Sequence, residues 1–326
     1  MEFIFLGTSS GTPTKTRNVS GVAVKMASSK SWCLVDCGEG TQHQILFTNL
    51  SLNNLQAIFI THVHGDHCYG LPGLLASATL SGRTGPLSII GPSAIKEFVE
   101  STQKTTQMIL SYKISFLDIE TISELIDVKE FEIEVVELSH RVPSFAYGFI
   151  ENNINRSLNI CKLKEDGIEA GPVWGDLQKG KDVLLPNGKK LKSRDYLLDR
   201  RKPRKIIVSG DNDNPSLLAD CAKRANVLIH EATYTEDIAE KVGKGPQHSS
   251  AKVIAQFATD ISIANLVLTH FSPRYQDINN DKASIEDIRH EAMDYYNGNL
   301  FLANDLDVFN LNKEGELVKI KSFEKA

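Results

Sequence analysis

The sequence predicts an α/β protein, and three observations lead to this class. Short apolar runs recur along the chain and indicate buried or half-buried strands. Segments with helix-start signals and helical periodicity lie between several of these runs. Polar side chains suited to metal binding follow the ends of four predicted strands, and sites in α/β folds gather at the carboxyl ends of strands.

The first half of the chain is the richer in strands. We expect strands over residues 3–6, 22–26, 32–35, 57–60, 87–90 and 131–136. Helices are expected over about 41–49 and 70–80, and from Ser93, as the N-cap, to about 103. In the second half we expect strands over 205–208, 227–229, 265–268, 300–302 and 308–311, and a helix over 250–259.

One short run concentrates candidate metal ligands, and it reads Thr-His-Val-His-Gly-Asp-His from Thr61 onward. His62 and His64 are two residues apart, so they project to the same side of an extended chain. The glycine that follows permits a sharp turn, which aims Asp66 and His67 elsewhere. Nitrogen and oxygen ligands without cysteine are typical of hydrolytic rather than structural zinc.

Four predicted strands lead into a candidate ligand, namely His62, His140, Asp211 and His270. Together with the rest of the run, the full set is His62, His64, Asp66, His67, His140, Asp211 and His270. These ligands divide between two ions if Asp211 is shared, and a pair of ions suits hydrolysis at phosphorus. Asp66 is also a candidate base that takes a proton from the attacking water.

His248 and Glu231 are candidates for the proton transfer to the leaving group. In RNA cleavage the leaving sugar hydroxyl needs a proton, and a histidine is the usual donor near neutral pH. We expect His248 to be this acid and Glu231 to orient it and raise its pKa. The alternative for His248 is an ordinary surface-loop histidine, since it follows Lys-Gly-Pro-Gln.

The formal net charge is −5, but the charge is unevenly distributed. Residues 152–205 contain 14 Lys and Arg against 7 Asp and Glu, so the rest of the chain is acidic. We therefore expect one domain over 1–326 with a basic arm inserted at 152–204, which projects without a core of its own. Its candidate phosphate contacts are Lys179, Lys181, Lys189, Lys190, Lys192, Arg194, Arg200, Arg201, Lys202 and Arg204.

Composition also bounds the setting of the protein. The sequence has no apolar run of membrane-spanning length, so no membrane partner is expected. Its first residues lack a basic region and run straight into a strand, so no signal peptide is expected. Five cysteines without a C-x-x-C spacing indicate reduced thiols and a cytoplasmic location. Cys68, next to His67, is expected to pack rather than to bind metal.

The H-x-H-x-D-H run after a strand resembles the signature of the metallo-β-lactamase superfamily. This resemblance implies a four-layer αββα sandwich with a dinuclear site at one edge of its two sheets. Four further motifs are similar to those of the ribonuclease Z family, short bacterial form, namely Pro13–Asn18 (P-x-K-x-R-N), Gly38–Gln42, His230–Thr233 (H-E-A-T) and His248–Ser250. The Gly-Asp-Asn-Asp-Asn loop is less typical after Asp211, which makes Asp213 a minor competitor for the metal role.

Membership of that family would imply a zinc-dependent endoribonuclease that removes the 3′ trailer from precursor transfer RNA and leaves a 3′-hydroxyl. Two zinc ions per chain, or manganese in their place, would be the cofactors. Lys15, Arg17 and Asn18 would sense the 3′ end of the RNA, and the arm would grip the transfer RNA, often across a homodimer. Two alternatives stay open, a metal-dependent phosphodiesterase of the same fold acting on small substrates and a non-catalytic RNA-binding scaffold.

Overall fold

The computed structural model describes residues 1–152, 154, 156–198, 201–276 and 283–324. Two compact units make up the chain, which we call the body, Met1–Ile150 with Arg204–Ala326, and the arm, Glu151–Pro203. Within the described residues, no helix has both the length and the apolar character needed to cross a membrane.

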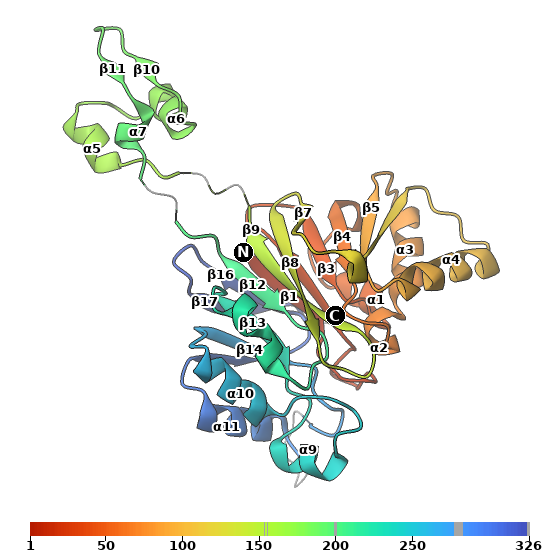
Figure 1. The fold of residues 1–326 in the computed structure, drawn as a ribbon. Coiled ribbons are helices and arrows are strands. Elements are labelled where there is room, and N and C mark those ends of the chain that lie inside the picture. Colours follow the sequence, from red (N-terminus) through yellow and green to blue (C-terminus); the bar gives the residue numbers. More distant parts are fainter. Residues whose placement is uncertain (153, 155, 199–200, 277–282, 325–326) are drawn as a thin grey trace. The chain divides into compact units, whose positions relative to one another are not determined.

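The body is built on two sheets (Figure 1). The first has eight strands in the order β17-β16-β1-β2-β3-β4-β5-β6. Their bounds are β1 Glu2–Gly7, β2 Gly21–Lys25, β3 Trp32–Val35, β4 Leu55–Phe59, β5 Leu87–Gly91, β6 Ile114–Asp118, β16 Asp307–Leu311 and β17 Leu317–Ser322. The second has seven strands in the order β15-β14-β13-β12-β9-β8-β7. These are β7 Ile126–Val128, β8 Phe131–Leu138, β9 Ser144–Glu151, β12 Lys205–Val208, β13 Val227–Glu231, β14 Asn265–Thr269 and β15 Asn299–Leu302.

Helices cover the outer face of each sheet. Those packed on the first sheet are α1 Thr41–Ile45, α2 Gly65–Cys68, α3 Leu71–Leu80 and α4 Ala94–Thr106. Those packed on the second are α8 Ala219–Ala222, α10 Ala251–Asp260 and α11 Ile285–Tyr295, while α9 Glu236–Val242 lies next to α10. Short 3₁₀ helices span Leu52–Asn54, Ile119–Thr121 and Pro215–Leu218. The expected four-layer αββα sandwich is confirmed.

The main core lies between the two sheets. Phe59 of β4 packs its ring against Tyr147 and Phe149 of β9, with centroids 5.0 and 5.4 Å apart. All three side chains are fully buried. Rings of this size bury enough apolar surface to hold the sheets face to face.

Backbone hydrogen bonds join the two sheets at the rim where strands β4 and β12 end. The amide of Phe145 donates to the Thr61 carbonyl at 3.1 Å, and the amide of Gly210 donates to the Phe145 carbonyl, also at 3.1 Å. A Cβ on Gly210 would lie 2.7 Å from Cβ of Thr61, so this close approach requires glycine. The rim thereby brings the segments after β4 and β12 together.

The arm has its own small core, which the sequence analysis did not anticipate. Its elements are α5 Ile160–Glu165, α6 Pro172–Gln178, β10 Val183–Leu184, β11 Lys190–Leu191 and α7 Ser193–Tyr196. Their buried side chains are Leu163, Ile168, Leu177, Leu191 and Tyr196. The apolar positions are too irregularly spaced to show a strand or helix period, which is why the pattern suggested a coreless insertion.

Several boundaries also differ from expectation. The helix expected over 41–49 ends at Ile45. Ser93 is the N-cap of α4 as expected, but it has helical φ and ψ and makes no side-chain capping bond, and the helix continues to Thr106. Strand β13 continues through His230 and Glu231. The strands that had no counterpart in the sequence analysis are β6, β7, β9 and β17 in the body and β10 and β11 in the arm.

Candidate metal centre

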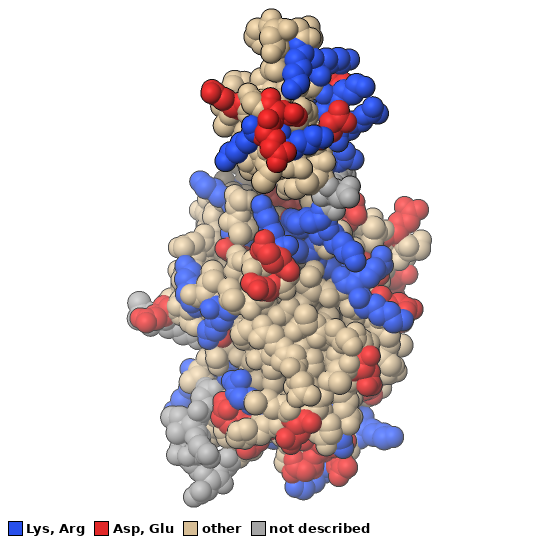
Figure 2. All heavy atoms as spheres, turned by 90° about the vertical axis from the view of Figure 1, so that its left-hand side faces the viewer, with Lys and Arg blue, Asp and Glu red and all other residues tan. Residues whose placement is uncertain are grey.

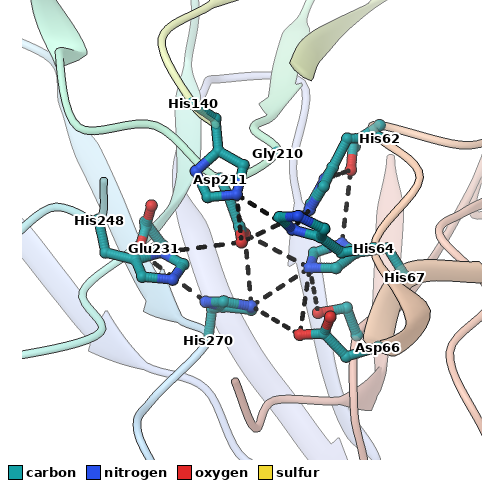
Figure 3. A network of polar contacts seen from close by, with 12 residues as sticks. His62, His64, Asp66, His67, His140, Gly210, Asp211, Glu231, His248 and His270 are labelled. Atoms are coloured by element: carbon teal, nitrogen blue, oxygen red, sulfur yellow. Dashed lines mark hydrogen bonds and ion pairs between the residues drawn. The ribbon is translucent and has the colours of Figure 1, made fainter. Parts of the chain in front are cut away.

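One group of ligand atoms gathers around Oδ2 of Asp211, at the end of β12 (Figure 3). Nδ1 of His64 lies 3.1 Å from Nε2 of His62 and 3.1 Å from Nε2 of His140. Oδ2 of Asp211 lies 3.6 Å from Nε2 of His62 and 3.7 Å from Nε2 of His140. Segments that follow three different strands thus supply four donors to one point.

A second group gathers around the other oxygen of the same carboxylate. Oδ1 of Asp211 lies 3.4 Å from Nε2 of His67 and 3.3 Å from Nε2 of His270. Oδ2 of Asp66 lies 3.5 Å from the same atom of His67 and 3.4 Å from that of His270. His270 has a φ of 58°, a left-handed conformation that is costly for a non-glycine residue and is found mostly at functional sites.

The spacing of these atoms fits tetrahedral metal coordination. Bonds of about 2.0–2.2 Å to nitrogen and oxygen give a tetrahedron whose edges are about 3.3–3.6 Å long. The donor separations in both groups, 3.1–3.7 Å, cluster around these edges. Seven sequence-predicted ligands therefore lie as two groups with Asp211 between them, and the donor set fits two divalent ions.

The charge of the ligand cluster also fits the binding of divalent cations. Burial, together with the neighbouring imidazoles, lowers the pKa of His62 well below its ordinary value, so this ring is neutral as a metal ligand must be. Burial would also lower the pKa of His67, but the carboxylates of Asp211, Asp66 and Asp36 raise it well above its ordinary value. This excess of buried negative charge is what divalent cations would balance.

Further hydrogen bonds orient the ligands from behind. Nδ1 of His67 lies 2.7 Å from Asp36, whose carboxylate also accepts from the amide of Thr61 at 2.8 Å. Nδ1 of His140 lies 2.9 Å from the carbonyl of Gln247, and Nδ1 of His270 lies 3.0 Å from the hydroxyl of Thr233. Such contacts fix which ring nitrogen faces the metal.

His248 and Glu231 stand together beside the second group. Nδ1 of His248 lies 2.9 Å from Oε2 of Glu231 and 3.7 Å from Oδ2 of Asp211. Burial would lower the pKa of His248, but the charge of Glu231 raises it to about 9. Burial would raise the pKa of Glu231, but the His248 ring lowers it to about 2. The pair is therefore a protonated imidazole on a carboxylate at neutral pH.

Asn212 connects this pair to the rest of the site, and the sequence analysis missed it. Its amide N–H donates to Oε1 of Glu231 at 2.7 Å, and its carbonyl accepts from the Ser249 hydroxyl at 2.6 Å. Its side chain lies 3.2 Å from Nε2 of His230, which is fully buried. The one available signal was its place in the unusual Gly-Asp-Asn-Asp-Asn loop. The side chain of Asp213 belongs to no ligand group among the described residues.

Comparison with known proteins agrees with this geometry. Ribonuclease Z of Marinobacter nauticus is 52% identical over 98% of this chain and 99% of its own length. Ribonuclease Z of Brevibacillus brevis is 39% identical over 95% of this chain and 96% of its own length. The chain belongs to the ribonuclease Z family. The family model described as Anti-Pycsar protein Apyc1 also matches, over residues 1–159.

Solved structures of similar proteins agree with this family membership. The short form of human tRNase Z superimposes with a TM-score of 0.64, is 27% identical and covers 96% of this chain and all of its own. YhfI from Bacillus subtilis, described as a metallo-β-lactamase fold protein, has the same TM-score at 18% identity, covers 94% of this chain and 98% of its own, and shows the fold alone.

The loop over Thr8–Asn18 of this ribonuclease Z touches the second ligand group, since the amide of Gly11 donates to Oδ2 of Asp66 at 2.7 Å. Lys15 is exposed and Asn18 half-buried. Arg17 departs from the expectation of an RNA contact. It is only 4% exposed and donates to Thr8 Oγ1, the Ala303 carbonyl and Asn304 Oδ1, each at 2.8 Å. Its guanidinium holds the loop and cannot reach a phosphate in this conformation.

The arm cations are mostly accessible. Lys179, Lys181, Lys189 and Lys190 are all exposed. Lys189 and Lys190 lie 4.0 and 3.9 Å from the carboxylates of Asp166 and Asp182. Arg204 departs from the expected phosphate contact, because it is buried in the body and donates to the Leu311 carbonyl at 2.7 Å. Arg200 lies outside the described residues.

Cys68 is buried, and its thiol contacts the carbonyl of Val63 at 3.5 Å. Burial raises the pKa of this thiol to about 12, so it is not a ready metal ligand. All five cysteines are free.

Proposed function

We propose that this protein is a zinc-dependent endoribonuclease that removes the 3′ trailer from precursor transfer RNA and leaves a 3′-hydroxyl. The observation that carries the proposal is two candidate ligand groups, one of four residues that includes Asp211 and one of three residues whose His67 and His270 lie within 3.4 Å of Asp211 Oδ1. They lie beside a protonated histidine, in a chain 52% identical to a ribonuclease Z. We propose two zinc ions per chain, with manganese as the replacement.

A pair of divalent ions, when bound, supplies a water activated near neutral pH and neutralises charge on the phosphate oxygens. Hydrolysis then joins the water oxygen to phosphorus and breaks the bond from phosphorus to O3′. Asp66, a largely buried carboxylate of the second group, accepts the proton of the water. His248 donates a proton to O3′ as the bond breaks, and Glu231 holds the ring in place.

The decisive experiment uses precursor transfer RNA with a labelled 3′ trailer. Metal-depleted protein should leave it intact, and added zinc or manganese should release the trailer and expose a 3′-hydroxyl that a nucleotidyl transferase can extend. An intact precursor in the presence of either metal would exclude the proposal. Hydrolysis of bis(p-nitrophenyl) phosphate by the same sample, with no RNA cleavage, would favour the small-substrate phosphodiesterase instead.

The arm favours the RNA substrate over a small one. Figure 2 shows many of its Lys and Arg side chains exposed toward one side, with several Asp and Glu side chains among them. Exposed cations that follow a phosphate backbone give a binding that does not depend on sequence and weakens with salt. Ile150 of β9 pairs with Lys205 of β12, so a short turn can replace residues 152–203. This variant should lose RNA cleavage and keep hydrolysis of the small diester.

We also propose that the protein is a cytoplasmic homodimer. Large apolar side chains are exposed near α1, α3 and α4, and they are Leu46, Tyr69, Leu80 and Ile109, at 75%, 66%, 89% and 86%. A contiguous exposed apolar patch is typical of an association surface, and we propose that these side chains belong to one. Sedimentation of the wild type should give a dimer, and Leu80→Glu should shift it toward the monomer. A wild-type monomer at micromolar concentration would refute the dimer.

A further inference from the structure

A pocket of about 540 Å³ opens beside His248, and the proposed reaction does not yet use it. It lies between helix α9 and the segment 243–250, and its lining includes Tyr234, Glu236, Glu240, Lys244 and His248. The volume falls within the range of about 300–1,000 Å³ that small-molecule sites occupy. It can therefore accept one nucleoside.

The position of the proposed proton donor, His248, indicates which nucleoside of the RNA lies beside the pocket. His248 and Asp66 lie on opposite sides of Asp211, as Figure 3 shows. His248 protonates the leaving O3′, so the nucleotide that carries O3′ lies on its side of the metal centre. In an in-line displacement the water attacks opposite O3′, so Asp66, as the base for that water, lies on the side away from the retained nucleotide. The pocket beside His248 thus adjoins the last nucleotide that the RNA retains.

The chemistry of the pocket suits a base rather than a phosphate. Its carboxylates, Asp213, Glu236 and Glu240, would repel a phosphate, whereas carboxylates accept hydrogen bonds from the amino groups of bases. An aromatic ring is also present, since Tyr234 is half-buried and its ring centroid lies 6.1 Å from that of His248. Bases of any sequence pack on such rings.

The ring of Tyr234 is held in place. Arg274 lies over it, with the guanidinium carbon 5.2 Å from the centroid, and Nε of Arg274 donates to the Ser272 hydroxyl at 3.1 Å. The backbone carbonyl of Tyr234 accepts from the amide of Ala251 at 2.8 Å. No side chain among the described residues forms a hydrogen bond with the Tyr234 hydroxyl, so the ring is anchored without using its polar end.

We propose that this pocket binds the base of the nucleotide whose 3′-oxygen leaves, with Tyr234 as the surface on which the base packs. The proposal rests on the proposed function and adds a binding subsite to it. Tyr234 acts here on the position of the RNA end, so that O3′ meets His248. It takes no part in the reaction of a substrate that has no base.

The test compares wild type and a Tyr234 variant on two RNA substrates. The substrates are a precursor transfer RNA with its normal last retained nucleotide and one that is abasic at that position. For the normal substrate, Tyr234→Ala should lower kcat/KM by about 5- to 100-fold, the range that base stacking contributes. For the abasic substrate, wild type and Tyr234→Ala should be equal. Tyr234→Phe keeps the ring and should behave as wild type.

The matched control is Tyr295→Ala, because Tyr295 is also a tyrosine under a cation, with Nζ of Lys252 5.7 Å from its ring centroid on α11. It should leave both substrates unaffected. Metal content and the midpoint of denaturant unfolding should be the same in all variants, which shows that each is folded and carries its metals. An equal loss by Tyr234→Ala on both RNAs would overturn the proposal.

Binding gives a readout that does not depend on turnover. With 2-aminopurine as the last retained base and Asp66→Asn to prevent cleavage, binding should quench the fluorescence, and adding Tyr234→Ala should relieve the quenching. Unquenched fluorescence in the complex with an intact Tyr234 would contradict the subsite. If the wild type cuts the normal and the abasic precursor with equal kcat/KM, the subsite is refuted and the proposed function stands. If the wild type does not cut the normal precursor, both the proposed function and the subsite are refuted.

Discussion

Oδ2 of Asp36 lies 2.7 Å from Nδ1 of His67, on the side of the ring away from the metal-binding nitrogen. The same carboxylate accepts from both the amide and the hydroxyl of Thr61. Asp36 directly follows strand β3, so it connects the end of that strand to the segment that begins at Thr61 and contains the candidate ligands. Its φ is 59°, a conformation that Asn also tolerates.

Asp36→Asn should therefore lower metal affinity without disrupting the backbone. The Thr61 amide, the Thr61 hydroxyl and the His67 ring donate to the two oxygens of the carboxylate. An asparagine side chain has only one acceptor oxygen, so at least one of these hydrogen bonds is lost. We expect a loss of about 10- to 100-fold in affinity for the second ion. Metal titration after chelation and dialysis measures it. Asp220→Asn is the control, because the Asp220 side chain is 99% exposed, and affinities equal to that control would contradict the role of Asp36.

The His248–Glu231 pair predicts the alkaline side of the pH profile. The pKa of His248 is raised to about 9, mainly by Glu231 acting against burial. The acid form is present below this pKa and is lost as the pH rises through it, so kcat for trailer removal should fall near pH 9. Glu231→Gln removes the raising charge and should move this fall to lower pH, whereas Glu231→Asp keeps the charge. A fall that stays in place in Glu231→Gln would show that another group titrates.

Arg17 and Lys15 belong to one loop but should behave differently. Arg17 is buried among three acceptors, so Arg17→Ala should lower the free energy of unfolding by about 2–4 kcal/mol. Lys15 is exposed, so Lys15→Ala should change it by less than about 0.5 kcal/mol. Denaturant titration compares the two. Equal effects would mean that the guanidinium does not anchor the loop.

The candidate metal ligands that the structure brings together could be predicted from the sequence because their signals are local. His62, His64, Asp66 and His67 occur in one run, and His140, Asp211 and His270 each follow a predicted strand. The rule that sites collect at the carboxyl ends of strands then brings distant segments together. The fold class followed from the same strands.

The structural roles that escaped prediction, those of Asp36 and Arg17 among them, depend on contacts that are distant in sequence. Asp36 contacts His67, which is 31 residues away in the sequence, and Arg17 contacts Asn304, which is 287 residues away. Strand β9 contains Gly148, a poor strand former, but a Cβ there would lie 2.8 Å from Cε of Lys205. The residue at this position therefore packs against Lys205 of the neighbouring strand, a contact that no local pattern reveals.

The arm lysines offer a last prediction, in which ion pairing ranks the residues. Lys189 and Lys190 each lie within 4.0 Å of an arm carboxylate, whereas no ion pair to a described carboxylate involves Lys179 or Lys181. A lysine that is already paired gives up part of its attraction to a phosphate, although pairs this exposed are weak. Lys179→Ala and Lys181→Ala should therefore weaken precursor binding more than Lys189→Ala and Lys190→Ala.

Each residue that contacts a phosphate should also reduce the slope of log Kd against log salt by about 1 when it is removed. Lys223→Ala on the body is the control, because its side chain is 63% exposed and pairs with Asp220 at 3.1 Å. Binding titrations with a cleavage-deficient variant at several salt concentrations measure both quantities. If all four arm variants kept the wild-type slope, the arm would not contact the RNA backbone through these lysines, and its basic charge would act only at long range.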